Sequence, residues 1–231
     1  MRGHNFIILQ KPPAFLLKFP VFVQQLINGL TLGGVYALIA LGYTMVYGIL
    51  ELINFAHGEI YMLGAYLGII FLGFFTAIGL TSASLPLSLL LAFVLTVIFC
   101  SAYGYTMEKI AYRPLRNAPR LSPLISAIGV SIFLQNYVML TQGATDKVFP
   151  HIFENAGFEM NGINVTYIQL FIISGSGIMM MFLHLFITRT RMGKAMRAVA
   201  QDKVMASLVG INVDTVISAT FIIGSGLAAV A

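Results

Sequence analysis

Long apolar runs separated by short polar segments dominate the pattern of this chain. Five of these runs are long enough for a membrane-spanning helix, which needs about 20 mostly apolar residues. They are Phe19–Leu50, Ile60–Leu80, Leu85–Met107, Leu121–Thr141 and Tyr167–Thr188. A sixth run begins near Val213 and continues to Ala231, so we expect a chain truncated at its C-terminus. The pattern predicts an all-α fold, a polytopic transmembrane helix bundle in a single domain of residues 1–231.

The composition supports a location in the membrane. Hydrophobic residues make up 58% of the chain and charged residues 9%, whereas soluble domains carry about 25% charged residues. A surface facing water cannot be built from so few charges, so the apolar faces must contact lipid. The basic and then apolar start is interrupted by Pro12, Pro13 and Pro20, which argues against a cleaved signal peptide.

The charges in the loops predict the orientation of the chain. Segment Glu108–Arg120 carries four basic residues and one acidic residue, and Thr188–Asp214 carries five basic and two acidic residues. Segment Gln142–Thr166 carries three acidic residues and one basic residue. Short loops rich in lysine and arginine stay in the cytoplasm. We therefore predict that the two basic segments are cytoplasmic and that Gln142–Thr166 lies outside.

The first third of the chain leaves the side of the N-terminus open. Three simple crossings before Glu108 would put the N-terminus outside, whereas Arg2, Lys11 and Lys18 favour the inside. An extra broken or half-length pass within Phe19–Leu80 would remove this conflict. The many glycines of that segment, including pairs four residues apart such as Gly29 and Gly33 or Gly64 and Gly68, would permit a break and predict close helix packing within the bundle.

A polar interruption separates the first two apolar runs. It contains Asn54, His57 and Glu59, with Gly58 permitting a break in the helix. Ionisable groups near membrane depth are costly unless they pair or face a cavity, and broken helices present free backbone groups to a substrate. One hypothesis is that these three side chains line a translocation pathway. The other is an ordinary interfacial loop, in which His57 and Glu59 are solvated or cap the next helix. The spacing predicts no metal site.

A basic amphipathic segment lies in the second basic loop. Lys194–Leu208 is rich in alanine, methionine, lysine, arginine and glutamine, which favour a helix, and Gly210 supplies a stop. We predict a single helix of about four turns. Its short, mostly apolar stripe is formed by Met196, Val199, Ala200 and Lys203.

Such a helix has two uses. It can lie on anionic lipid head groups, or it can fit a groove on a partner protein. The stripe is only modestly hydrophobic and has no aromatic residues, which favours docking on a partner. The basic residues Arg189, Arg191, Lys194 and Arg197 either hold the helix on that partner and at the lipid surface or only set the topology.

Several separate motifs resemble the permease subunits of bacterial ABC importers for branched-chain amino acids, in the order that the family has them. The resemblance extends from about Phe22 to Ala231. The motifs are Val23–Gly48, Ile53–Ala65, Tyr112–Arg116, Ser122–Gly129 and Gly193–Asp202 running on to Gly210 and Ile211.

The resemblance implies that Lys194–Gly210 is the coupling segment, which docks on a cytoplasmic ATPase like the EAA-type loop of ABC importer permeases. Arg197–Ala200 stands where this loop has its Glu-Ala-Ala pattern, so the individual contacts are open. The resemblance also implies that Asn54–Glu59 is a membrane-embedded broken region near the pathway. The residues expected in the coupling segment are Lys194, Met196, Arg197, Val199, Ala200, Asp202, Lys203 and Gly210.

The resemblance further implies an assembly in the bacterial cytoplasmic (inner) membrane. It would contain this chain, a second permease subunit forming a heterodimer with it, two cytoplasmic ATP-binding subunits, and a periplasmic or lipid-anchored substrate-binding protein that docks on outer loops such as Gln142–Thr166. The chain has no G-x-x-x-x-G-K-[ST] phosphate loop, so a partner would hydrolyse ATP. We expect a transporter subunit that forms half of the pathway, is not an enzyme, uses no cofactor and binds no nucleic acid.

Three alternatives stay open. A permease of the same family could carry another amino acid, an amide or urea. A secondary transporter or channel working without ATP would explain the spans but leave the cytoplasmic helix without a role. A membrane-embedded enzyme would need a cluster of catalytic groups at membrane depth, where only His57 and Glu59 stand out.

Overall fold

The computed structural model describes residues 14–231 except 117, 120, 146, 148–156 and 161. Within these residues, six helices are long and apolar enough to cross a membrane. Helices form there because lipid offers no hydrogen-bond partners, so each backbone group must be satisfied inside its own segment. The predicted polytopic helix bundle is confirmed. The six helices are α1 (Ala14–Leu50), α2 (His57–Ala77), α4 (Leu85–Met107), α5 (Leu121–Gln142), α6 (Tyr167–Arg189) and α9 (Val213–Val230).

Shorter elements connect these helices. An antiparallel hairpin of two short strands precedes α6, a small addition to the predicted all-α fold. A π-helical turn and a 3-10 turn follow α4 directly. The bounds are α3 (Leu80–Ala83), η1 (Glu108–Tyr112), η2 (Arg113–Leu115), β1 (Gly157–Met160), β2 (Ile163–Thr166), α7 (Arg191–Gln201) and α8 (Lys203–Leu208).

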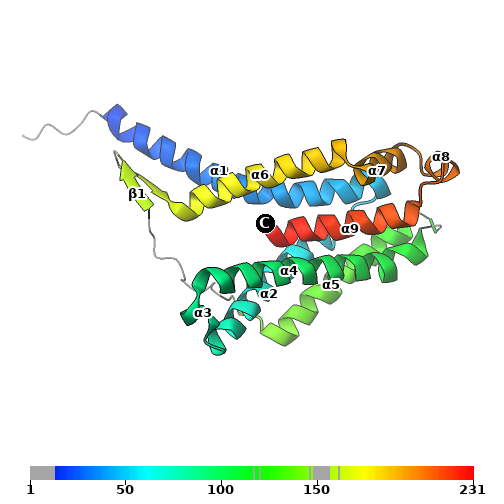
Figure 1. Ribbon diagram of the computed structural model, residues 1–231, viewed down its shortest axis with the longest axis horizontal. Coiled ribbons are helices and arrows are strands. Elements are labelled where there is room, and N and C mark those ends of the chain that lie inside the picture. Colours follow the sequence, from blue (N-terminus) through cyan, green and yellow to red (C-terminus); the bar gives the residue numbers. More distant parts are fainter. Residues whose placement is uncertain (1–13, 117, 120, 146, 148–156, 161) are drawn as a thin grey trace, which may run out of the picture.

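Helix α9 lies at the centre of the bundle, with α1 and α6 on one side and α2, α4 and α5 on the other (Figure 1). Small residues allow this position. Gly224 of α9 packs against the backbone of Gly42 in α1, and a Cβ at Gly104 of α4 would overlap the side chain of Ser225. Van der Waals packing of this kind holds membrane helices together, because lipid supplies no hydrophobic force between them.

The glycine pairs expected to mediate packing behave differently from one another. Gly64 lies at the contact between α2 and α9, where an added Cβ would be 3.3 Å from the Cα of Ala229. Gly29, Gly33 and Gly68 have no atom of this chain within 4 Å of an added Cβ. The packing prediction is confirmed for Gly64 and wrong for the other three, where an added Cβ would meet no described atom; Gly29 and Gly33 are exposed, and Gly68 is half-buried.

The first third of the chain makes two crossings, α1 and α2. Helix α1 runs without interruption from Ala14 to Leu50, and the polar interruption lies after it, at residues 51–56. The extra pass expected within Phe19–Leu80 is therefore absent from the described residues of that segment. The apolar run continues the helix because its glycines are tolerated where lipid leaves the backbone no alternative partner.

The direction of α1 shows which loops lie at the same end of the molecule as its N-terminus. Its first half lies beside the β-hairpin, where the side chain of Gln24 accepts a hydrogen bond of 2.9 Å from the N–H of Asn164. This end is opposite to the one that carries η1, η2, α7 and α8 (Figure 1). The positive-inside rule predicts that the end with the basic segments is cytoplasmic, and with that orientation α1 would begin on the outer side. Of the residues that favour the opposite side, Lys18 lies in the first turns of α1, whereas Arg2 and Lys11 lie outside the described residues.

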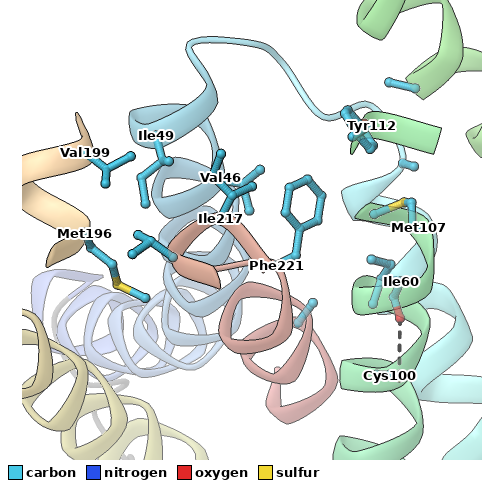
Figure 2. Close-up of a cluster of buried hydrophobic side chains, with 14 of the residues drawn as sticks. Val46, Ile49, Ile60, Cys100, Met107, Tyr112, Met196, Val199, Ile217 and Phe221 are labelled. Atoms are coloured by element: carbon cyan, nitrogen blue, oxygen red, sulfur yellow. Dashed lines mark hydrogen bonds between the residues drawn. The ribbon is translucent and has the colours of Figure 1, made fainter. Parts of the chain in front are cut away.

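An apolar cluster near the cytoplasmic end joins α7 to the membrane helices. Figure 2 shows Met196 and Val199 of α7 pointing toward Ile49 of α1 and Ile217 of α9. All four side chains are buried. Because α7 buries its apolar side here, it is part of the bundle and not a loosely attached loop.

Candidate functional site

Residues 51–56 turn back into the bundle after α1 ends at the cytoplasmic side. Glu51 makes the turn with a φ of 59°, a left-handed conformation. Helix α2 then begins at His57, whose Nε2 lies 3.2 Å from the carbonyl oxygen of Ile39. Ile39 precedes the end of α1 by about three helical turns. The first turn of α2 therefore lies well inside the bundle and not at the cytoplasmic surface.

Asn54 holds this returning segment in place. Its side chain is 2% exposed, and its Oδ1 accepts hydrogen bonds from the Tyr112 hydroxyl at 2.7 Å and from the Ala56 N–H at 3.0 Å. The bond to Ala56 is an Asx turn, which leads the chain into α2. The bond to Tyr112 ties the segment to η1, whereas Nδ2 has no partner among the described residues.

Glu59 connects α2 to α5. Its Oε1 accepts hydrogen bonds from the Ser131 hydroxyl at 2.9 Å and from the Gln135 amide at 2.6 Å. Neither donor was predicted, although two polar residues four apart in an apolar run were a signal that they share a helix face.

The three residues expected along a pathway thus contact three different elements. Asn54 is bonded to η1, His57 to α1 and Glu59 to α5. They fix the position of the α2 start, and they do not converge on one described cavity. His57 is fully buried, whereas Glu59 is only partly covered.

A cluster of charged side chains joins η1 and η2 to the start of α9. Glu108 has no exposed surface. Its carboxylate pairs with Arg116 and accepts a hydrogen bond of 2.7 Å from Ser218. Asp214 pairs with Arg116 and, at 2.7 Å, with Arg113. Buried charges are tolerated when they are paired in this way. In the sequence these residues count only as loop charges, because Asp214 and Ser218 lie about 100 positions from their partners, and the pairing of Glu108 with Arg116, eight positions apart, depends on how η1 and η2 fold.

A hollow of about 480 Å³ opens beside this cluster. It lies between the end of α1, the segment after α4, α8 and the start of α9. Its lining includes both charges and apolar side chains, namely Glu51, Tyr112, Arg116, Lys203, Val204 and Asp214 among others.

The cytoplasmic segment contains two helices instead of the predicted single helix Lys194–Leu208. Asp202 has an extended backbone between α7 and α8, and its carboxylate accepts the N–H groups of Val204 at 2.8 Å and Met205 at 3.0 Å. Asp202 is thus the N-cap of α8, a role for which its short acidic side chain is well suited. The composition favoured helix throughout, but the cap competes locally with the continuing helix.

The predicted stop at Gly210 is confirmed. Gly210 has a φ of 86°, and the N–H of Ile211 donates to the carbonyl oxygen of Ala206 at 3.0 Å. Glycine reaches this left-handed conformation without a steric penalty, so it ends α8 with a Schellman motif.

The corner between α6 and α7 is tight and well bonded. An added Cβ at Gly193 would overlap the carbonyl groups of Phe186 and Ile187. The Thr190 hydroxyl accepts a hydrogen bond of 3.0 Å from the N–H of Gly193. Arg197 donates to the carbonyl oxygen of Thr188 at 3.4 Å, close to the negative end of the α6 dipole.

The apolar stripe predicted for partner contact is divided between two environments. Met196 and Val199 are buried in this chain's own core, so they attach α7 to the bundle and are not free for docking. Ala200 is exposed and Lys203 half-buried. A different apolar surface, which we call the α8 patch, is open instead. It consists of Val204, Met205, Leu208 and Val209, with exposed fractions between 61% and 76%.

Comparison with known proteins decides the class of molecule. The family described as branched-chain amino acid transport system / permease component matches residues 25–231. The chain belongs to this permease family. It is a multi-pass membrane protein of a transport system.

Curated relatives cover most of this permease. The high-affinity branched-chain amino acid transport system permease protein BraD of Pseudomonas aeruginosa is 51% identical over 214 residues, which are 91% of this chain and 69% of BraD. The LivH protein of Escherichia coli K12, of the same description, is 48% identical over 93% of this chain and 70% of its own length. A probable LivH of Methanocaldococcus jannaschii is 26% identical over 84% of the chain. No solved structure matches.

The candidate sites of this permease thus fall into two groups, with a charged cluster between them. The start of α2, with Asn54, His57 and Glu59, lies within the membrane-spanning bundle. The α8 patch and the basic side chains of α7 lie at the cytoplasmic end. The charged cluster around Glu108 and Arg116 lies between them, and Tyr112 in the same η1 turn contacts Asn54 directly.

Proposed function

We propose that this permease forms half of the translocation pathway of an ATP-driven importer for branched-chain amino acids in the bacterial cytoplasmic membrane. The names of its curated relatives support leucine, isoleucine and valine as substrates. A second permease subunit forms the other half, and a binding protein delivers the substrate to the outer side, where the β-hairpin lies. Two cytoplasmic ATP-binding subunits supply the energy.

The observation that carries the ATPase contact is the α8 patch. Its four apolar side chains are exposed, and they lie at the end of the molecule that carries the basic segments. An apolar patch with a charged rim is typical of a protein-binding surface. The rim is supplied by Lys194 and Arg197, both exposed on α7. The coupling segment would therefore dock through α8 and the rim of α7.

The attachment of this segment suits it for transmitting movement. Helix α7 is anchored in the core by Met196 and Val199, and the Schellman turn at Gly210 joins α8 to α9 by a short connection. Helix α9 is the central helix, so a displacement of α8 by the ATPase reaches the contacts of α9 with α1 and α4. Packed helices connected in this way are one route by which energetic coupling is carried between two sites.

The docking proposal predicts the effect of charge in the α8 patch. Met205→Glu together with Leu208→Glu should reduce co-purification of the ATP-binding subunits with the permease by about tenfold or more, because truncating central interface anchors costs over 1 kcal/mol each. ATP-dependent leucine uptake in proteoliposomes should fall in parallel.

The matched control is Met205→Leu, which keeps the apolar surface and should retain both activities. Undiminished co-purification in the double glutamate variant would reject the docking surface. Leucine uptake by the wild-type assembly without ATP would reject the ATP-driven function itself.

A further inference from the structure

Glu59 places a carboxylate near the middle of the membrane-spanning region. Its hydrogen-bond donors, Ser131 and Gln135, lie near the middle of α5, which spans Leu121–Gln142. An ionised carboxylate at this depth is costly unless it has a charged partner or faces water. The position of Glu59 therefore calls for a counter-charge or an aqueous path.

The described residues supply no such counter-charge within ion-pair distance. The donors to Glu59 are a hydroxyl and an amide, both neutral, and they bind the same oxygen, Oε1. No described lysine, arginine or histidine forms an ion pair with Glu59. The two hydrogen bonds orient the side chain, and neither donor brings a positive charge.

Glu108 shows how this protein treats a carboxylate that serves structure. It is fully buried, and Arg116 pairs with it from eight residues further along the chain. Glu59 differs on both counts, since it is partly exposed and forms no ion pair with a cation in the part of the chain that the structure describes. A carboxylate that is oriented and partly exposed can bind a cationic ligand transiently.

The surroundings of Glu59 are open as well. Its neighbour Gly58 has no atom of this chain within 4 Å of an added Cβ, and Gln135 is exposed. Phe55 and Ile53, in the segment leading into α2, are exposed apolar side chains. A partly exposed carboxylate with exposed apolar side chains a few positions before it in the chain matches the chemistry of an amino acid that carries an ammonium group and an aliphatic side chain.

We propose that Glu59, oriented by Ser131 and Gln135, binds the α-ammonium group of the amino acid while it crosses the membrane. The inference rests on the proposed function and adds a residue and a ligand group to it. A single carboxylate with two neutral supports holds a zwitterion only weakly, and a transient station in a pathway must also release its ligand.

Carboxyl labelling tests this station in the assembled transporter, with both permeases and the ATP-binding subunits in proteoliposomes. A membrane-permeant carbodiimide should modify Glu59, as read by mass spectrometry of the peptide that contains it. Three probes compete: leucine, 3-methylbutylamine, which lacks the carboxylate, and 4-methylpentanoate, which lacks the amine. Leucine and the amine should reduce labelling to about a tenth at concentrations ten times their apparent Kd, because one site is then about nine-tenths occupied. The acid should give no protection.

Other labelling patterns would contradict the proposed binding of the ammonium group by Glu59. Protection by none of the probes, or by all three alike, would mean that Glu59 does not recognise an ammonium group. No labelling of the assembled transporter, with labelling once the second permease is removed, would mean that Glu59 pairs with that subunit.

Uptake by variants separates this inference from the proposed function. Glu59→Gln should lose leucine uptake while the loaded binding protein still stimulates ATP hydrolysis, and Glu59→Asp should keep part of the uptake. Full uptake by Glu59→Gln would reject the station alone. Absence of ATP-driven leucine uptake in the wild type would reject the proposed function.

Discussion

Single buried polar side chains govern the start of α2. Asn54 is the most constrained of them, because its oxygen serves both the Asx turn and the Tyr112 hydroxyl. Within an apolar bundle such bonds have no competing water, and losing one leaves a buried polar group unsatisfied. The residue therefore links the membrane-embedded segment to η1 at the cytoplasmic end.

Tyr112→Phe tests this link. The variant removes the donor to Asn54 and keeps the ring that packs against Phe221, whose centroid is 5.2 Å away. We expect the unfolding free energy in detergent to fall by about 1–2 kcal/mol, measured as a lower thermal unfolding midpoint. Tyr105→Phe, on the exposed side of α4, is the matched control and should leave the midpoint unchanged. Equal midpoints for the two variants would show that the Asn54 bond adds no stability.

Helices α7 and α8 differ from the single helix that the residue pattern predicted. The composition of Lys194–Leu208 predicts helix correctly for most of its residues, and Gly210 marks the end. The break at Asp202 was not predicted, because an aspartate in a helix-forming segment acts as a cap only if its backbone is extended. The direction of the apolar stripe also required the structure, since amphipathic spacing does not say whether the chain itself or a partner covers that face.

Gly193→Ala tests the corner that sets the direction of α7. The added methyl group meets backbone carbonyls of α6, which cannot move aside as a flexible side chain can. We expect a loss of about 1–3 kcal/mol in unfolding free energy and weaker co-purification of the ATP-binding subunits. In Gly68→Ala, the methyl group meets open space in α2, so both quantities should stay at the wild-type level. Wild-type behaviour of Gly193→Ala would contradict the tight corner.

For the whole molecule, α9 and the charged cluster at its start connect segments that are far apart in the sequence. Glu108, Arg116 and Asp214 tie the end of α4 to α9, and α9 in turn separates α1 from α4 (Figure 1). Breaking a buried ion pair by removing one charge is much more costly than replacing both partners. The cluster should therefore behave as a coupled unit.

A double-mutant cycle measures this coupling. Glu108→Gln leaves the half-buried Arg116 with one carboxylate fewer, and we expect a loss of about 3 kcal/mol in unfolding free energy. Arg116→Gln should cost a similar amount. The double variant should be less destabilised than the sum of the two, because neither charge is left unpaired in it. Additive losses in thermal or denaturant unfolding would show that the pair does not contribute to the stability of the bundle.

The spans and their order could be predicted from the residues alone and are confirmed, whereas the cytoplasmic position of the basic loops stays a prediction from their charge. Lipid makes this possible, because helix length and loop charge respond to the bilayer and not to distant neighbours. The course of the first third could not, since a run rich in glycine is equally compatible with a break and with the intact helix α1. Charge counting likewise located Glu108 and Arg116 in a loop without revealing that they pair.

Glu59 shows, in one residue, which features the sequence predicts and which only the structure reveals. Its acidic side chain at the edge of an apolar run already marked it as a candidate, because charge near membrane depth is costly anywhere. Its depth, its two donors on α5 and the absence of a described cation depend on contacts between residues about 70 positions apart. The sequence by itself determines which chemical groups each segment carries. Burial and pairing depend on contacts between separate helices, which only the tertiary structure shows.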